Sequence, residues 1–206
     1  MENKKYKISV YLDILPVNPR EEYDNITKMW CGHKRYNLPK EIDIDDTDCT
    51  DWIDVYDEIV EAVKLQGDEI VKSKSIYMLD HSGLRVSLED FNDCWDSGQI
   101  GYIFITKNAI KENKIKDKDV GKIIEDEFND WKAYMEGNIY GYSILKKKVC
   151  KCCGNVEYEN VDGLGGIIAN DMEDIKEAIE ENTDEDILKD IQDLLDNFDD
   201  IEIEEY

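Results

Sequence analysis

Residues 80–106 read DHSGLRVSLEDFNDCWDSGQIGYIFIT, and the last six letters, GYIFIT, are the stretch that decides the fold. Residues 101–106 are almost continuously apolar and rich in β-branched and aromatic side chains, which is typical of a strand inside a sheet. Turn-forming residues precede it: Asp96 and Ser97 can bond nearby backbone amides, and Gly98 can adopt a positive φ. We therefore expect a central strand that begins at a tight turn.

Apolar periodicity on both sides of this strand predicts the other elements. Strands are expected at residues 5–15, 70–79, 84–88, 139–149 and 156–161. Helices are expected at residues 50–65 and about 117–136, with two more after residue 170, opened by Thr50, Asp117, Asn170 and Thr183 respectively. Glycines at 163, 165 and 166 predict a flexible loop. Strands on both sides of the helices, joined by hairpin-like connections, predict an α+β fold with a mainly antiparallel sheet packed by helices.

The net charge of the chain favours one class of binding partner over another. The 206 residues contain 25 basic and 50 acidic side chains, a net charge of −25, while 41% hydrophobic residues suffice for a folded core. Such a chain repels a phosphate backbone, so direct binding of nucleic acid is not expected. A basic protein is the partner that this charge favours.

The acidity is concentrated at the end of the chain. Residues 171–206 hold 17 Asp or Glu and two Lys, a net charge of −15, and their last helix has a clear apolar stripe. That stripe must be buried, either on the rest of the chain or on a partner. We expect a core domain at residues 1–166 and an acidic helical segment at residues 167–206. Its candidate binding residues are Asp184, Glu185, Asp186, Asp190 and Asp193.

The cellular location is predicted from two features that the sequence lacks, a signal peptide and a membrane-spanning run. The first residues, MENKKYKISVYLDIL, lack the long apolar region and cleavage site of a signal peptide, and no run is long enough to span a bilayer. We therefore expect a protein of the host-cell cytoplasm without a membrane partner. Its six cysteines, at 31, 49, 94, 150, 152 and 153, are then expected to be mostly free thiols.

Residues 80–106 contain several residue types that can take part in catalysis. His81 stands near Cys94 and Asp96, and a cysteine or serine nucleophile needs such a base. No known nucleophile motif surrounds them, so we assign no catalytic residue. The alternative is an exposed binding surface, for which the candidates are Trp95, Asp96, Gln99 and Tyr102.

The sequence contains one partial motif for a metal site. Cys150 and Cys153 form C-x-x-C-G, the shape of a zinc knuckle, but a structural zinc ion takes four ligands. Cys31 and His33 could supply the missing pair across space. Because no second C-x-x-C exists, we expect no metal and no cofactor.

Three motifs carry a resemblance to known proteins: WCGHKRYNL at 30–38, DHSG at 80–83 and CWDSGQIG at 94–101. They resemble a family of small uncharacterised proteins from bacteriophages and mobile elements of Gram-positive bacteria. The resemblance covers residues 18–166, and it implies no assigned active site. By analogy with other small acidic phage proteins, it implies a role in countering host defence. No residue chemistry carries this expectation.

Three functions follow as hypotheses. The first is a phage-encoded acidic interaction protein that inhibits a host defence or nucleic-acid-handling protein, of the anti-CRISPR or anti-restriction type, with mimicry of nucleic acid as one route. Its partner would be a basic nuclease or defence effector. The second is a small hydrolase that depends on cysteine and histidine or on a metal. The third is a nucleic-acid-binding accessory protein that uses the basic stretch His33, Lys34 and Arg35 with Trp30 and Tyr36.

Overall fold

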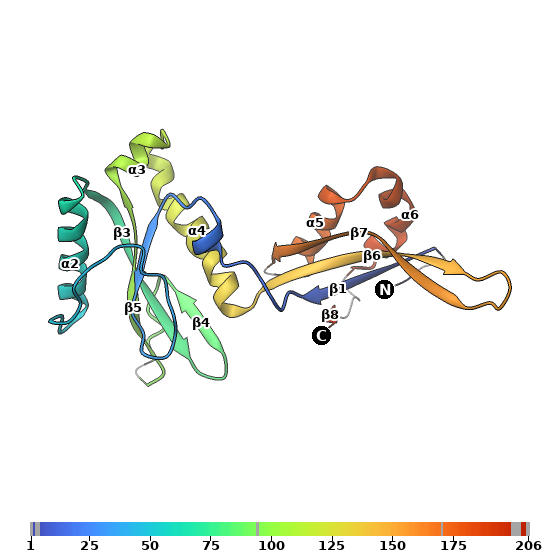
Figure 1. Ribbon diagram of the computed structural model, residues 1–206, viewed down its shortest axis with the longest axis horizontal. Helices are drawn as coiled ribbons and strands as arrows, with labels where there is room; N and C mark the ends of the chain where they lie inside the picture. The colour runs from blue at the N-terminus through green and yellow to red at the C-terminus, as the bar shows by residue number, and fades with distance from the viewer. Residues whose placement is uncertain (1, 3–4, 94, 170, 199–202, 205–206) are drawn as a thin grey trace. The chain divides into compact units, whose positions relative to one another are not determined.

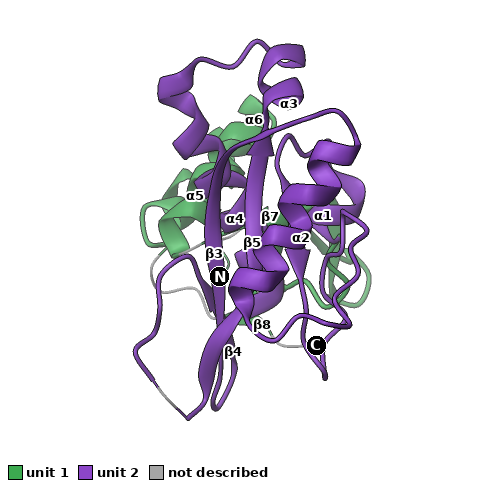
Figure 2. Ribbon diagram, turned by 90° about the vertical axis from the view of Figure 1, so that its left-hand side faces the viewer, with its two compact units in different colours: residues 1–17, 137–206 green, residues 18–136 purple. Residues whose placement is uncertain are grey.

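The computed structural model describes residues 2, 5–93, 95–169, 171–198 and 203–204. The chain forms two compact units, coloured separately in Figure 2. Unit 2 is the continuous segment Asn18–Glu136, and unit 1 combines Met1–Val17 with Gly137–Tyr206. Helices pack on antiparallel sheets in each unit, so the predicted α+β class is confirmed.

Unit 2 has a four-stranded antiparallel sheet in the order β2-β5-β3-β4. Its elements are α1 (Pro19–Glu22), β2 (Lys28–Cys31), α2 (Trp52–Leu65), β3 (Ile70–Asp80), β4 (Leu84–Ser87), β5 (Ser97–Thr106), α3 (Lys107–Glu112), η1 (Asp117–Asp119) and α4 (Val120–Glu136). As predicted, GYIFIT lies in an internal strand, β5.

Helices α2 and α4 lie on opposite faces of this sheet (Figure 1). Side chains alternate along β5, so neighbouring residues enter different cores. Phe104 packs with Ile59 of α2, while Ile103 and Ile105 pack in the core that contains Ile124 of α4. Burial on both faces explains why residues 101–106 of this strand are almost continuously apolar.

Two predicted local contacts are wrong. Helix α2 is capped by Asp51, which accepts hydrogen bonds from the amides of Ile53 and Asp54, and not by Thr50. Before β5, Asp93 rather than Asp96 accepts the amides of Trp95 and Asp96. In both places the accepting aspartate lies two and three residues before the amides that it binds, which is the spacing of a helix N-cap or an Asx turn.

Gly101 is required where β5 meets β2. A Cβ at this position would lie 2.1 Å from the carbonyl oxygen of Trp30 and 2.7 Å from Cα of Cys31, both backbone atoms of the paired strand. We expect Gly101→Ala to lower the free energy of unfolding by about 1–3 kcal/mol, because the strands must separate. Urea denaturation measures this. Gly98→Ala is the control, since a Cβ there meets nothing within 4 Å; equal midpoints for the two variants would contradict the close approach.

Unit 1 has a second four-stranded sheet, in the order β7-β6-β1-β8. Its elements are β1 (Tyr6–Leu12), β6 (Ile139–Val149), β7 (Val156–Ile168), α5 (Met172–Asn182), α6 (Glu185–Leu195) and β8 (Ile203–Glu204). All pairs are antiparallel except β1 with β8. Helices α5 and α6 cover one face of the sheet, where Ile179 and Ile191 share a core with Ile8 and Ile144 (Figure 1).

Unit 2 is inserted between two neighbouring strands of unit 1. Strand β1 pairs with β6 along its whole length, and the amide of Asp13 donates to the carbonyl of Ile139 at 2.8 Å. The chain therefore leaves unit 1 and returns to it at adjacent points, which is why an insertion of this size is compatible with the sheet.

The end of the chain differs from its prediction in three places. The glycines at 163, 165 and 166 lie within β7 instead of a loop, and Asp184 rather than Thr183 caps α6. The expected cap Asn170 lies outside the described residues, and Asp171 caps α5. The domain boundary expected at residue 166 falls inside unit 1, because the acidic helices and strands β1 and β6 bury one shared core.

Candidate functional site

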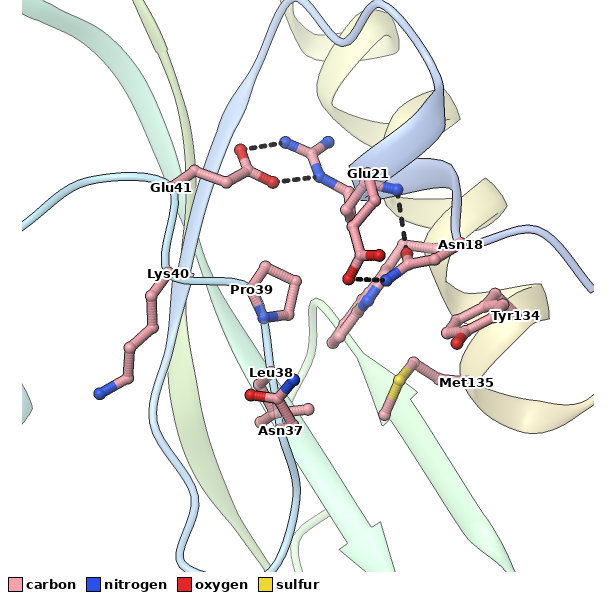
Figure 3. Close-up of a pocket in the computed structure, with 11 residues that line it drawn as sticks. Asn18, Glu21, Asn37, Leu38, Pro39, Lys40, Glu41, Tyr134 and Met135 are labelled. Carbon is pink, nitrogen blue, oxygen red and sulfur yellow. Dashed lines mark hydrogen bonds and ion pairs between the residues drawn. The ribbon is translucent and has the colours of Figure 1, made fainter.

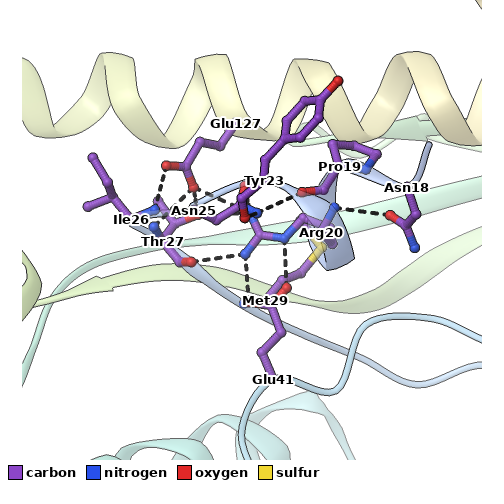
Figure 4. A network of polar contacts seen from close by, with 10 residues as sticks. All are labelled: Asn18, Pro19, Arg20, Tyr23, Asn25, Ile26, Thr27, Met29, Glu41 and Glu127. Carbon is purple, nitrogen blue, oxygen red and sulfur yellow. Dashed lines mark hydrogen bonds and ion pairs between the residues drawn. The ribbon is translucent and has the colours of Figure 1, made fainter. Parts of the chain in front are cut away.

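A buried polar network joins four segments of unit 2 (Figure 4). The Arg20 side chain is 1% exposed, and its guanidinium donates to both carboxylate oxygens of Glu41 at 2.7 and 2.6 Å. It also donates to Glu127 of α4 at 3.3 Å and to the carbonyl of Thr27 at 2.9 Å. Glu127 in turn accepts the amides of Ile26 and Thr27. Since every charge has a partner, the network stabilises the fold and is not poised for chemistry.

The cavity beside this network has a volume of about 510 Å³ (Figure 3). Its walls are Asn18, Arg20, Glu21, Asn37, Leu38, Pro39, Lys40, Glu41, Trp131, Tyr134 and Met135. Most of its charges are engaged within the protein: Arg20 with Glu41, Asn18 with Glu21, and Lys40 with Asp46 at 3.6 Å. The cavity therefore has a mixed polar and apolar wall, whose charged groups are mostly paired within the protein.

The three sequence motifs meet at a second cavity, of about 300 Å³, which we call the motif cavity. It is lined by His33, Arg35, Met78, Asp80, Trp95, Asp96, Ser97, Gly98, Gln99 and Ile100. Strand pairing brings them together, because Cys31 at the end of β2 pairs with Gly101, and Leu79 near the end of β3 pairs with Ser97. The end of two strands and the start of a third thus share one end of the sheet.

Asp80 is the polar centre of the motif cavity. Its carboxylate accepts from Arg35 at 2.5 Å and from the Tyr36 hydroxyl at 2.8 Å. The hydrogen bond to Asp80 raises the pKa of Tyr36, because the phenol donates best when protonated. The Asp80 amide donates to the Asp96 carbonyl at 2.9 Å, which ties the DHSG turn to the segment before β5.

A histidine–carboxylate pair lies at the same end of the sheet. His81 Nδ1 and the Asp96 carboxylate are 2.7 Å apart, and both side chains are exposed. A carboxylate in this position orients an imidazole for proton transfer. Among the described residues no hydroxyl or thiol bonds to His81, and the Ser97 hydroxyl donates to the Asp93 carbonyl. Cys94, the cysteine considered in the hydrolase hypothesis, lies outside the described residues.

Three of the four predicted contact residues, Trp95, Asp96 and Gln99, line the motif cavity. Trp95 is 92% exposed, which suits a contact residue. Tyr102 does not line the cavity: it packs against Trp52 and Tyr56, its hydroxyl donates to the Trp52 carbonyl, and burial raises its pKa. The pairing of Arg35 with Asp80 was not predicted, since no local pattern connects residues 45 positions apart.

The basic stretch proposed for nucleic acid is largely occupied within unit 2. Trp30 is buried, and Lys40 lies over its ring at 5.1 Å. Arg35 is paired with Asp80, and the His33 ring lies 5.0 Å from that of Tyr36. Trp30 is therefore not available to stack on bases, while Lys34 and Arg35 remain exposed.

A second candidate surface covers the outside of α5 and α6. We call it the acidic face and define it by Asp171, Glu173, Asp174, Glu177, Glu180, Glu181, Asp184, Glu185, Asp186, Asp190, Asp193 and Asp196, which are exposed or half-buried. The predicted binding residues belong to it but differ in role. Asp184 caps α6, Asp186 pairs with Lys189 at 3.2 Å, and Asp190 pairs with Lys5 at 2.9 Å.

Two of the weak candidates for zinc ligands, Cys31 and His33, are engaged within unit 2. Cys31 is buried in the core under α4, and burial raises the pKa of its thiol. His33 Nδ1 accepts the Arg35 amide at 3.3 Å. Within the described ranges, the one group of side chains spaced to share a metal ion is Cys150, Cys152 and Cys153.

Comparisons of the chain with protein-family models, with curated proteins and with solved structures gave no match. The resemblance to a phage family therefore stays a prediction. Among the described residues, no helix combines the length and apolar character needed to cross a membrane.

Proposed function

We propose that this protein is an acidic interaction protein that inhibits a host defence or nucleic-acid-handling protein, of the anti-CRISPR or anti-restriction type. The acidic face would occupy a basic groove of the target that otherwise holds nucleic acid. The observation that supports this best is the layout of α5 and α6: their apolar side chains are buried in the core of unit 1, so their carboxylates are held on a folded surface.

The charge spacing along α6 supports mimicry. Asp184, Glu185, Asp186, Asp190, Asp193 and Asp196 place six carboxylates on this helix and its caps. With a rise of about 1.5 Å per residue, that is roughly one carboxylate per 3–4 Å of axis. One strand of DNA carries a phosphate per ~3.4 Å of axis. A groove that binds phosphates thus meets a similar spacing of carboxylates, of which Asp186 and Asp190 are paired with Lys189 and Lys5.

The test uses a panel of purified CRISPR effector nucleases and restriction endonucleases, in DNA cleavage assays with the full chain. We expect inhibition of at least one basic nuclease. Inhibition should weaken as NaCl rises from about 50 mM to about 200 mM, because exposed charges are screened and counterions compete. Inhibition that is unchanged by salt, or absent from the whole panel, would sink the decoy mechanism.

A variant of the acidic face sharpens this test. We expect Glu177→Gln, Glu180→Gln, Glu181→Gln and Glu185→Gln together to weaken inhibition by about 5- to 150-fold, corresponding to roughly 1–3 kcal/mol for four exposed charge pairs. These four residues are exposed and lie on the outside of the helices. The measurement is the concentration of protein that halves cleavage.

The matched control removes the same number of charges from unit 2. It combines Asp57→Asn, Glu61→Gln, Glu89→Gln and Glu112→Gln, which are also exposed. Inhibition by this control should equal that of the unmodified chain; an equal loss in both variants would show a dependence on net charge alone. His33→Ala and His81→Ala should retain inhibition, and its loss in either would favour a site at the motif cavity.

A further inference from the structure

The turn between β6 and β7 holds three cysteines in one loop. The amide of Gly154 donates to the carbonyl of Cys150 at 2.9 Å, and the amide of Cys150 donates to the carbonyl of Asn155 at 2.8 Å. Gly154 has a φ of 74°, a conformation that residues with a Cβ rarely adopt. These bonds close the turn and direct the thiols of positions 150, 152 and 153 toward one another.

The thiol spacing matches that of a metal centre. The sulfur atoms of Cys150, Cys152 and Cys153 all lie within 4.8 Å of one another, and those of Cys150 and Cys152 are 3.0 Å apart. In a tetrahedral zinc site with Zn–S bonds of about 2.3 Å, sulfur atoms are roughly 3.8 Å apart. The three thiols are thus near enough to share one ion, and rotation of the side chains would set the sulfur spacing that the ion needs. The three thiols can be reached from solvent: Cys152 and Cys153 are exposed, and Cys150 is half-buried.

We propose that this turn binds one thiophilic cation with a filled d shell, Zn²⁺ or Cu⁺, through the thiolates of Cys150, Cys152 and Cys153. Soft sulfur ligands select these ions over Mg²⁺ or Ca²⁺. C-x-x-C spacing alone supplies Cys150 and Cys153, which is too few; the fold adds Cys152 as the third ligand. With three protein ligands, a Zn²⁺ ion would keep a position open for water.

The test titrates the reduced full chain, without oxygen, in two arms. Zn²⁺ is offered in competition with a chromophoric zinc chelator, and Cu⁺ in competition with bathocuproine disulfonate. Native mass spectrometry gives the stoichiometry. We expect one ion per chain in at least one arm, with a thiolate-to-metal absorption band in the ultraviolet. No binding in either arm, or one ion shared by two chains, would overturn the proposal.

Variants locate the site. Cys150→Ser, Cys152→Ser and Cys153→Ser should each weaken binding by about 100-fold or more, because each removes a direct ligand. Cys49→Ser, outside the turn, should bind as the unmodified chain does. Circular dichroism checks that each variant is folded. Full retention of binding by Cys152→Ser would overturn the three-thiolate arrangement, as would equal loss in Cys49→Ser.

Discussion

Replacing Arg20 with alanine is expected to lower the free energy of unfolding by about 3–5 kcal/mol, because it leaves two partly buried carboxylates without their counter-charge. The guanidinium is almost fully buried, and it bridges Glu41 and Glu127 from opposite sides. Glu127 lies on α4 and accepts the amides of Ile26 and Thr27, so its own position depends on that bridge. Urea denaturation of the full chain, followed by circular dichroism, measures the loss.

Two further variants separate charge from packing at this position. Arg20→Met keeps most of the side-chain volume, so a similar loss would assign the effect to the unpaired carboxylates. Arg35→Ala is the matched control: its side chain is 69% exposed and paired with Asp80, and exposed pairs contribute about 0–1 kcal/mol. If Arg20→Ala cost no more than Arg35→Ala, the network would not have the structural role that we assign to it.

Replacing Ile191 with alanine is the second change with a large expected effect, about 2–5 kcal/mol of unfolding free energy. Ile191 is fully buried in the core that α5 and α6 share with β1 and β6. Removing three carbons from this core loses apolar burial and leaves a cavity. Thermal or urea unfolding measures the change, and hydrogen exchange of the α5 and α6 amides should speed up.

The control for Ile191 is Ile53→Ala on α2. Ile53 is 70% exposed, so its truncation should change stability by no more than about 0.5 kcal/mol. Equal effects of the two substitutions would mean that α6 is not packed on the sheet. The apolar stripe would then be available to a partner, and the acidic face would not be held in a fixed arrangement.

The candidate site was predictable in part. Trp95, Asp96 and Gln99 were selected because their residue types suit contacts, and all three line the motif cavity. The hydrogen bonds of Asp80 with Arg35 and Tyr36 were not predicted, because they join β3 to the segment after β2. Likewise C-x-x-C identified Cys150 and Cys153, whereas the proximity of Cys152 depends on how the turn closes.

The sequence by itself determined the elements whose signal is local. The apolar run of β5, the stripes of α4 and α6, and the concentration of charge after residue 170 all depend on neighbours within a few turns or residues. These patterns were enough for the α+β class, because each amphipathic face requires a partner layer.

Only the tertiary structure decided which layers meet. Strand β7 holds three glycines that read as a loop, yet it pairs with β6, where a Cβ at Gly163 would lie 2.7 Å from the carbonyl oxygen of Tyr142. Strand β8 joins β1 from the other end of the chain, and residues 18–136 are inserted between β1 and β6. Such pairings depend on contacts between residues that are distant along the chain, and periodicity carries no information about them.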